Sequence, residues 1–240
     1  MLLIAVAAGG LATGFLVYRR AAGPASVLTA SAPSPAATAP GAPGAVSDAT
    51  GGPAEAAAPA APIPEAVPDV VLQDMAGRRR ALRDASGHPH LYNFWATWCE
   101  PCRREIPLLN TLQGAYRADR LQVVGIAVDF RDSVRDFLKA QPLHYSLLIG
   151  EEDGLEAAQK FGMELNLPFS VFADGQNRII AVKVGELHRA EADAILQAMR
   201  DLQAGRVSLA QARSGIAAAL KALALERAKQ SGPKGAELSH

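Results

Sequence analysis

The chain has 240 residues, a formal net charge of zero at pH 7 and an isoelectric point near 7.0. This balance points to neither nucleic acid nor an acidic surface as a partner, and the length allows one domain with extensions or two small domains. The two cysteines are too few for a structural disulfide framework. They fit a redox pair or half of a zinc site, but no second cysteine pair completes tetrahedral zinc, so we expect no bound metal.

The N-terminal residues form an apolar segment. Residues 1–18 carry no charged side chain, and Arg19-Arg20 ends the run. Such a run is just long enough to cross a bilayer, so residues 1–20 are predicted to be a membrane anchor or an uncleaved signal. A cleaved signal peptide is the alternative, with Ala30-Ser31-Ala32 as a small-residue cleavage site. Taken literally, the positive-inside rule would place Arg19-Arg20 and the following chain in the cytoplasm.

Residues 21–67 are rich in Ala, Pro, Gly, Ser and Thr and have no periodic apolar face. A segment of this composition cannot bury enough apolar surface to fold, so we predict a disordered linker. Its prolines favour extended conformations, which would make it a semi-stiff spacer between a membrane and a domain.

Residues 68–203 show the alternating pattern of a folded domain. Strands are predicted at 70–72, 90–96, 121–128, 145–149, 169–172 and 179–184, and helices at 100–116, 133–140, 155–161 and 192–202. The run at 90–96 is almost continuously apolar, which indicates a central strand covered on both faces. An Asp-Gly turn within 173–177 joins the last two strands as a hairpin. This order predicts an α/β fold with a mixed β-sheet flanked by helices on both faces.

Residues 204–240 contain a further predicted helix and a tail. Ser208-Leu209-Ala210-Gln211 has the pattern of a capping box, and an Ala-rich segment follows to about residue 229. Ile216, Leu220 and Leu223 fall on one stripe of this helix. The stripe either packs on the domain or binds a partner, and the residues after 230 are predicted to be disordered.

The two cysteines lie between a predicted strand and a predicted helix, in the run Cys99-Glu100-Pro101-Cys102. Free N–H groups and the positive end of the dipole at a helix start favour the thiolate, the form that attacks a disulfide. The spacing lets Cys102 reach back and displace Cys99 from a mixed disulfide. We therefore predict Cys99 as the nucleophile and Cys102 as the resolving thiol. A purely structural bridge over so short a loop would constrain the unfolded chain little.

Glu100 places a negative charge beside the thiols, and such a charge disfavours the thiolate. A reduced form that is poorly stabilised is the better reductant, so we predict reduction of substrates. Oxidation or isomerisation of disulfides by the same pair is the alternative.

The run Phe94-Trp95-Ala96-Thr97-Trp98-Cys99-Glu100-Pro101-Cys102 resembles the active-site motif of the thioredoxin superfamily. Together with residues 103–107 it is similar to the membrane-anchored TlpA-like branch of bacterial thiol–disulfide reductases, which includes the ResA-like proteins of cytochrome c maturation. The resemblance covers about residues 68–202 and implies the thioredoxin fold, which the order of elements indicates independently.

The resemblance also implies a biological setting. It implies reduction of disulfides in exported proteins such as apocytochrome c, re-reduction by a membrane electron donor, and no cofactor. It places the protein at the cell membrane with the catalytic domain facing the periplasm or cell exterior, against the orientation that Arg19-Arg20 alone would give.

By the same resemblance, Glu105 assists proton transfer at the cysteines, and a partly buried glutamate with a raised pKa suits that task. The alternative is a favourable acid in the first turns of a helix. Thioredoxins carry a buried aspartate in the preceding strand, where this chain has Asn93, which cannot take a proton. This difference makes Glu105 more necessary.

Leu167-Pro168 matches the cis-proline loop that faces the disulfide in this superfamily, and the backbone of Leu167 would pair with a substrate strand. Phe169 stands where a small polar residue is common, which puts the shape of the substrate groove in question. Trp98 is expected on the surface as a contact platform, with Glu100 and Pro101 also meeting the substrate, whereas Trp95 is expected in the core.

Two further functions are weighed from the residues. A thiol peroxidase needs a hydroxyl beside the cysteine to bind peroxide; Thr97 is near, but no Pro-rich peroxidatic loop is present. A module that delivers haem or a metal ion would need Met or His ligands close to the pair. Within ten residues on either side, His90 is the one such residue.

Overall fold

The computed structural model describes residues 62–85, 87–164 and 166–231. The predicted membrane segment and almost all of the predicted linker lie outside these residues, as does the tail from residue 232. Among the described residues, no helix combines the length and the apolarity needed to cross a membrane.

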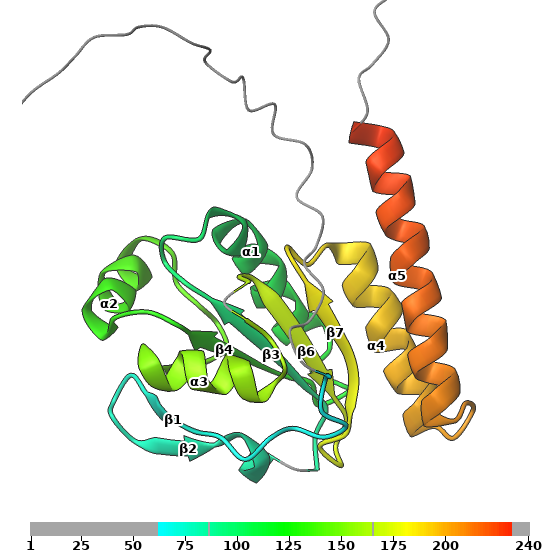
Figure 1. The fold of residues 1–240 in the computed structure, drawn as a ribbon, viewed down its shortest axis with the longest axis horizontal. Helices are drawn as coiled ribbons and strands as arrows, with labels where there is room; N and C mark the ends of the chain where they lie inside the picture. The colour runs from blue at the N-terminus through cyan, green and yellow to red at the C-terminus, as the bar shows by residue number, and fades with distance from the viewer. Residues whose placement is uncertain (1–61, 86, 165, 232–240) are drawn as a thin grey trace, which may run out of the picture. The chain divides into compact units, whose positions relative to one another are not determined.

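Seven strands form one mixed sheet in the order β2-β1-β5-β4-β3-β6-β7 (Figure 1). The strands β3, β4 and β5 run parallel, and the outer strands pair antiparallel with their neighbours. All six residues of β3 are buried, as its apolar sequence predicted. The strands are β1 (Val71–Asp74), β2 (Arg79–Ala81), β3 (His90–Trp95), β4 (Gln122–Ala127), β5 (Ser146–Ile149), β6 (Phe169–Ala173) and β7 (Ile179–Val184).

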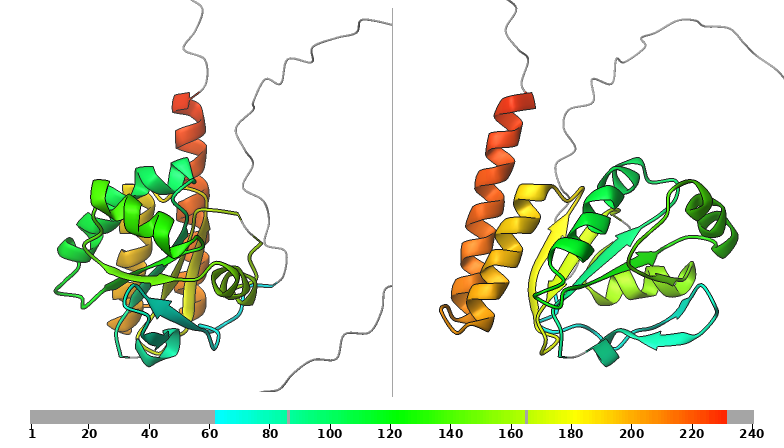
Figure 2. Two further views of the ribbon diagram at one scale, coloured as in Figure 1. Left: turned by 90° about the vertical axis from the view of Figure 1, so that its left-hand side faces the viewer. Right: turned by 180° about the vertical axis from the view of Figure 1, so that it is seen from behind.

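Helices cover both faces of the sheet (Figure 2). On one face, α3 (Glu152–Lys160) packs against Tyr92 and Phe94 of β3. On the other face, α1 (Glu100–Ala115) and α4 (Arg189–Gln203) enclose a second cluster around Leu91. The short helix α2 (Arg131–Ala140) packs beside α1, with its Phe137 ring 5.3 Å from that of Trp95. This arrangement confirms the predicted mixed sheet with helices on both faces.

Helix α1 continues through Pro107, which lies inside it. Proline has no N–H group, so it leaves the carbonyl of Arg103 without its helical partner. The side chain of Gln141, at the end of α2, donates to this carbonyl at 3.1 Å. A contact between two helices thus compensates for the proline inside α1.

The folded part begins before the predicted boundary at residue 68. Val67 is fully buried, and its N–H donates to the carbonyl of Asn177 at 2.8 Å. Ala66 forms an isolated bridge with Arg178. Pro64 and Pro68 gave this stretch the composition of a linker. Between them, residues 65–67 form a short extended segment that pairs with the hairpin between β6 and β7. A 3-10 helix, η1 (Leu82–Ala85), was also not predicted, because four residues carry no readable periodicity.

The predicted C-terminal helix is α5 (Leu209–Ser231), and it lies along α4 (Figures 1 and 2). The predicted capping box is present: Ser208 N–H donates to Gln211 Oε1, and Gln211 N–H donates to Ser208 Oγ. Ile216 is buried in the cluster between α1 and α4. Packing on the domain is therefore the outcome for this part of the helix, while Leu225 further along is 55% exposed.

Candidate redox-active site

The cysteine pair lies where β3 gives way to α1. Cys99 is the N-cap residue of α1, and its Sγ accepts a hydrogen bond from the backbone N–H of Cys102 at 3.3 Å. The two sulfurs form a disulfide, with 5.3 Å between the Cα atoms. Cys99 is 5% exposed and Cys102 is fully buried. The more accessible cysteine is thus the one predicted as the nucleophile, at the end of the helix that favours a thiolate.

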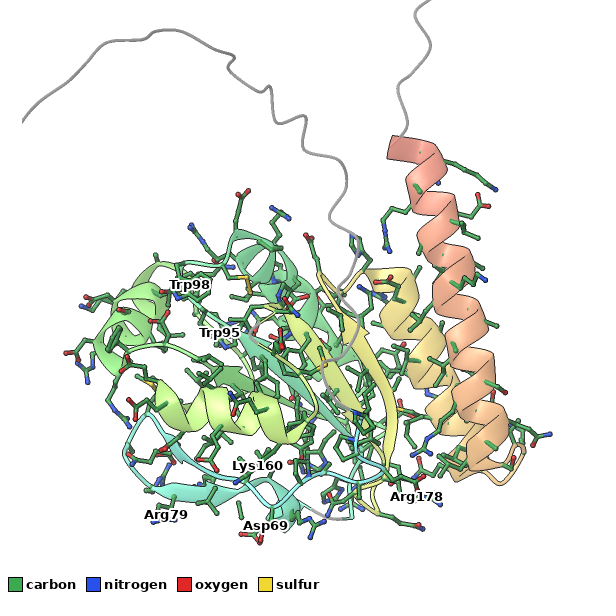
Figure 3. All side chains as sticks on the ribbon, viewed as in Figure 1. Asp69, Arg79, Trp95, Trp98, Lys160 and Arg178 are labelled. Carbon is green, nitrogen blue, oxygen red and sulfur yellow. A yellow bond between two sulfur atoms is a disulfide. The ribbon has the colours of Figure 1, made fainter. Side chains whose placement is uncertain are left out.

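The two tryptophans take different positions. Trp98 is 64% exposed and lies beside the start of α1, while Trp95 is fully buried below it (Figure 3). Trp98 therefore offers an aromatic surface next to Cys99, as expected, and Trp95 belongs to the core.

The carboxylate of Glu100 is exposed and forms an ion pair with Arg104 at 3.0 Å. Arg104 also pairs with Glu186 at 2.7 Å. Arg104 and the surrounding water both weaken the effect of the Glu100 charge on Cys99, so this effect is smaller than the sequence alone suggested.

Glu105 lies one turn after Cys102 on α1 and is 2% exposed. Its Oε1 accepts a hydrogen bond from Asn93 Nδ2 at 2.7 Å, and its Oε2 accepts one from the N–H of Leu187 at 2.6 Å. Burial raises the pKa of Glu105 to about 7, although these two hydrogen bonds act in the opposite direction. A carboxyl group with such a pKa can take up or release a proton near neutral pH.

Further polar groups surround Glu105 that sequence reasoning did not identify. Asn93 Nδ2 also lies 3.1 Å from the hydroxyl of Ser170, on β6. The charge of Lys183, on β7, lowers the pKa of Glu105, while that of Glu186 raises it. Ser170, Lys183 and Glu186 lie far after the cysteines in the sequence, so no local motif could have indicated them.

The peptide bond between Leu167 and Pro168 is cis, as the resemblance predicted. Leu167 packs against the cluster that contains both cysteines, which places the loop beside the disulfide. The carbonyl of Pro168 accepts a hydrogen bond from the N–H of Gly185 at 2.8 Å. Phe169 is fully buried, and its ring stacks on Phe94 at 4.2 Å. Its size is therefore accommodated in the core, away from the surface where a substrate would lie.

Asp129, just after β4, was not singled out in the sequence. Its Oδ2 accepts from both the N–H and the hydroxyl of Thr97, at 2.9 and 2.6 Å, and its Oδ1 accepts from the N–H of Phe130. This nearly buried carboxylate fixes the segment that leads into Cys99. A polar residue directly after a buried strand was the signal that could have found it.

The surroundings of Thr97 and His90 concern the two other functions considered, a thiol peroxidase and a module that delivers haem or a metal ion. The Thr97 hydroxyl donates to Asp129, so its proton is already engaged. His90 is buried at the far end of β3 from Cys99, stacked on Tyr92. Within the part of the chain that the structure describes, no three His, Cys, Asp or Glu side chains form a group that could hold a metal ion.

The fold and the cysteine pair at the start of α1 define a thiol–disulfide oxidoreductase of the thioredoxin superfamily. The AhpC/TSA family model matches residues 63–189, and the chain belongs to this family. The match ends at the start of α4, so α5 lies beyond it.

Individual relatives agree with this assignment. The chain is 30% identical over 125 residues to the thiol-disulfide oxidoreductase ResA of Bacillus thuringiensis subsp. konkukian, covering 52% of this chain and 70% of the relative. It is 34% identical over 128 residues to the thioredoxin-like protein YneN of Bacillus subtilis, covering 52% and 72%. Among solved structures, a putative thiol:disulfide interchange protein DsbE from Chlorobium tepidum superposes with a TM-score of 0.51 and 26% identity, covering 57% of this chain and 94% of that one.

Proposed function

We propose that this oxidoreductase is a reductant for disulfides of exported proteins, held at the membrane by residues 1–20. One observation carries the proposal: a more accessible Cys99 at a helix start is bonded to a buried Cys102, with buried Glu105 one turn further on. This order of groups suits attack by one sulfur, release by the other and transfer of one proton.

In the reaction, the thiolate of reduced Cys99 attacks a substrate disulfide, forming a mixed disulfide and releasing one substrate thiolate. Cys102 then loses its proton to Glu105, and its thiolate attacks Sγ of Cys99. The second substrate sulfur leaves, and the Cys99–Cys102 disulfide forms. Two electrons pass to the substrate, whose two sulfurs take up the two protons given up by the enzyme's thiols.

The substrate would lie across the surface formed by Trp98, Glu100 and Pro101. The backbone of Leu167, in the cis-proline loop, would pair with an extended substrate segment beside Cys99. This part of the proposal rests on the position of the loop against the cysteines and on the exposure of Trp98.

The oxidised enzyme must be reduced again, and we infer a membrane protein as the electron donor. Residues 1–20 would anchor the chain, residues 21–61 would act as spacer, and the domain would face the periplasm or cell exterior. An apocytochrome c is the candidate substrate, because its haem-binding Cys-x-x-Cys must be reduced before haem attachment. The similarity to proteins named ResA and DsbE supports the reaction class.

The reduction potential of the Cys99–Cys102 pair decides between reductant and oxidant. Equilibration of the purified protein with glutathione buffers should give a value near or below about −270 mV, the range of thioredoxin. A value above about −180 mV would instead identify an oxidase or isomerase.

Partner capture tests the substrate class. A Cys102→Ser variant cannot resolve the mixed disulfide, so it should accumulate disulfide-linked exported proteins in cells. A Cys99→Ser variant is the matched control and should capture none. If the Cys102→Ser variant captures no protein while the purified protein binds haem or a metal ion, a delivery module is the better description.

A further inference from the structure

Lys183, on β7, is nearly buried next to the polar surroundings of Glu105. Its side chain is 14% exposed, and its Nζ donates to the backbone carbonyls of Val184 at 2.7 Å and Glu186 at 3.1 Å. The same nitrogen lies 3.8 Å from the carboxylate of Glu191, on α4. An ammonium group loses hydration when it is buried, so it requires partners of this kind. The ammonium therefore holds two carbonyls of the turn that leads from β7 to α4.

One of these carbonyls lies opposite a donor to Glu105. The carbonyl of Glu186 belongs to the same peptide group as the N–H of Leu187, which donates to Oε2 of Glu105 at 2.6 Å. A trans peptide group is planar and its C=O and N–H point in opposite directions, so fixing one end aims the other. The half-exposed ring of His188 also lies 3.0 Å from this carbonyl, through Nδ1. Lys183 thus binds the back of the peptide group that donates to Glu105.

The other carbonyl is linked in the same way to the cis-proline loop. The Val184 carbonyl shares its peptide group with the N–H of Gly185, which donates to the carbonyl of Pro168 at 2.8 Å. Gly185 has a φ of 79°, a left-handed conformation that glycine adopts without steric cost. Lys183 therefore binds one peptide group that faces the cis-proline loop and another that faces Glu105.

The sheet places Lys183 on the same face as Asn93, the second donor to Glu105. Lys183 pairs with Ser170 of β6, and Ser170 pairs with Asn93 of β3. Directly paired residues of neighbouring strands carry their side chains on one face of a sheet. From this row Asn93 donates to Oε1 of Glu105 at 2.7 Å. Each oxygen of the carboxylate thus has one donor, and Lys183 holds the peptide group that supplies the donor to Oε2.

We propose that Lys183 is a positioning residue for the redox site, because its ammonium holds the two peptide groups that donate to Glu105 and to the cis-proline loop. It acts on Glu105 through the Leu187 N–H. Its positive charge also lowers the pKa of Glu105, against the effect of burial. The consequence for catalysis rests on the proposed role of Glu105 as proton acceptor, whereas the hydrogen bonds of Lys183 do not.

Further titratable or charged side chains face Glu105, Lys183 or the turn, and all of them stay unchanged in the test: Tyr145, Glu186, His188, Glu191 and Arg227. Burial raises the pKa of Tyr145, so its hydroxyl stays neutral near pH 7. Burial lowers the pKa of Lys183, while the charge of Glu191 raises it. With these groups in place, a shift in the titration midpoint of Glu105 reports the loss of Lys183.

The effect on the carboxylate can be measured by titrating the Glu105 carboxyl carbon by NMR in the oxidised protein, where the cysteines do not titrate. The variant Lys183→Met removes the ammonium and keeps an unbranched side chain. The midpoint should rise by about one pH unit, because a weaker donor and a lost positive charge both disfavour the carboxylate. The matched control is Lys160→Met, which removes a lysine from an exposed pair with Glu156 on α3, across the sheet. This control should leave the midpoint in place.

Hydrogen exchange separates positioning from charge. In Lys183→Met the amides of Gly185 and Leu187 should exchange about tenfold faster than in wild type, since their peptide groups are no longer held. The amides of β3 should be unchanged, which distinguishes a local effect from general destabilisation. An unchanged Glu105 midpoint would overturn the proposal. A raised midpoint with unchanged exchange at Gly185 and Leu187 would overturn it as well, because Lys183 would then act by charge alone.

If Lys183→Met does not fold, Lys183→Gln is the second variant. Its amide is too short to reach both carbonyls, so the same two changes are expected and decide in the same way. Both measurements are made on the oxidised, resting protein and are independent of disulfide reduction. Wild-type protein that failed to reduce disulfides would overturn the proposed function and leave the role of Lys183 standing. Unchanged readouts in the variant would do the reverse.

Discussion

At the scale of single residues, Glu105 is subject to opposing influences. Burial favours its neutral form, while the hydrogen bonds from Asn93 and the Leu187 N–H favour the carboxylate. Burial has the larger effect, so the pKa rises to about 7. A group balanced in this way can change its protonation during one catalytic cycle without large cost.

The variant Glu105→Gln should lose the pH dependence that this group confers. In wild-type protein, the rate of disulfide reduction should rise with pH through about 7, as Glu105 becomes able to accept a proton. At pH 8 the variant should be slower by about 100-fold, the lower end of the usual contribution from general acid–base catalysis. The measurement is kcat/KM between pH 5 and pH 9, with Glu156→Gln on α3 as the surface control. An inflection near pH 7 that survives in Glu105→Gln would assign the titration to another group.

The same pKa predicts how stability changes with pH. Below pH about 4.5 Glu105 is protonated in both the folded and unfolded states; between 4.5 and 7 the unfolded chain loses the proton and the folded protein retains it. The free energy of unfolding therefore falls as pH rises through this window, by about 3 kcal/mol at roughly 1.4 kcal/mol per pKa unit. Urea denaturation at pH 5 and pH 8 should show Glu105→Gln gaining this amount relative to wild type. A difference between the two proteins that does not change with pH would contradict the shifted pKa.

Local spacing was enough to predict which cysteine of the pair is the more accessible, whereas the interest in Glu105 and the cis bond before Pro168 came from the resemblance to the thioredoxin superfamily. Asp129 could not be predicted in the same way, since its contact with Thr97 depends on adjacent ends of two parallel strands. The hydrogen bond from Leu187 to Glu105 comes from a backbone N–H, so the type of residue at position 187 gives no indication of it.

At the scale of elements, α5 is joined to the domain by a buried charge. Glu191 of α4 is 1% exposed; its Oε1 accepts from Arg227 of α5 at 2.7 Å, and its Oε2 accepts from the N–H of His188 at 3.0 Å. Lys183 Nζ lies 3.8 Å from the same carboxylate. The residue before His188 is Leu187, whose backbone N–H donates to Glu105. Contacts through Glu191 and this segment therefore connect α5 to the polar surroundings of the cysteine pair.

The variant Arg227→Met should lower the free energy of unfolding by about 2 kcal/mol, because it leaves a buried carboxylate without its main counter-ion. The loss should be smaller than for a fully buried pair, since Arg227 is 35% exposed and Lys183 remains. The control Lys229→Met removes an exposed pair with Glu226 and should change stability by less than about 0.5 kcal/mol. Urea denaturation gives the free energy of unfolding of both variants and of the double variant Arg227→Met/Glu191→Gln. Comparing them measures what the ion pair between Arg227 and Glu191 contributes to stability. If the double variant is no more stable than Arg227→Met alone, the buried charge is not the cause.

Helices and strands with clear periodicity were predicted at nearly their observed positions. Their starts were less well predicted: α2 begins at Arg131 and α4 at Arg189, because polar first turns carry no apolar signal. The C-terminal helix was predicted from its capping box and apolar stripe, but its packing surface on α4 depends on the folded sheet.

At the scale of the whole molecule, the contacts described above for the cysteine pair all lie within residues 62–231. A fragment of residues 62–231 should therefore unfold at the same urea concentration as the full chain and reduce a soluble disulfide at the same rate. A fragment that begins at residue 68 should be less stable, because it lacks Val67 and the carbonyl of Glu65, which accepts from the N–H of Ile179. Parallel denaturation of the three proteins tests this, and a fragment from residue 62 that is clearly weaker would show that residues outside it contribute.

The two outer strands of the sheet also bear on self-association. At the start of β7, the N–H of Ile179 donates to Glu65 and its carbonyl accepts from Arg213 of α5, so neither group is free for another chain. At the opposite edge, β2 presents the exposed side chains of Arg79 and Arg80, whose charges repel an identical strand. Copies of this protein at high local concentration would thus lack an easy route to edge-to-edge aggregation, even during the repeated breaking and forming of their disulfide.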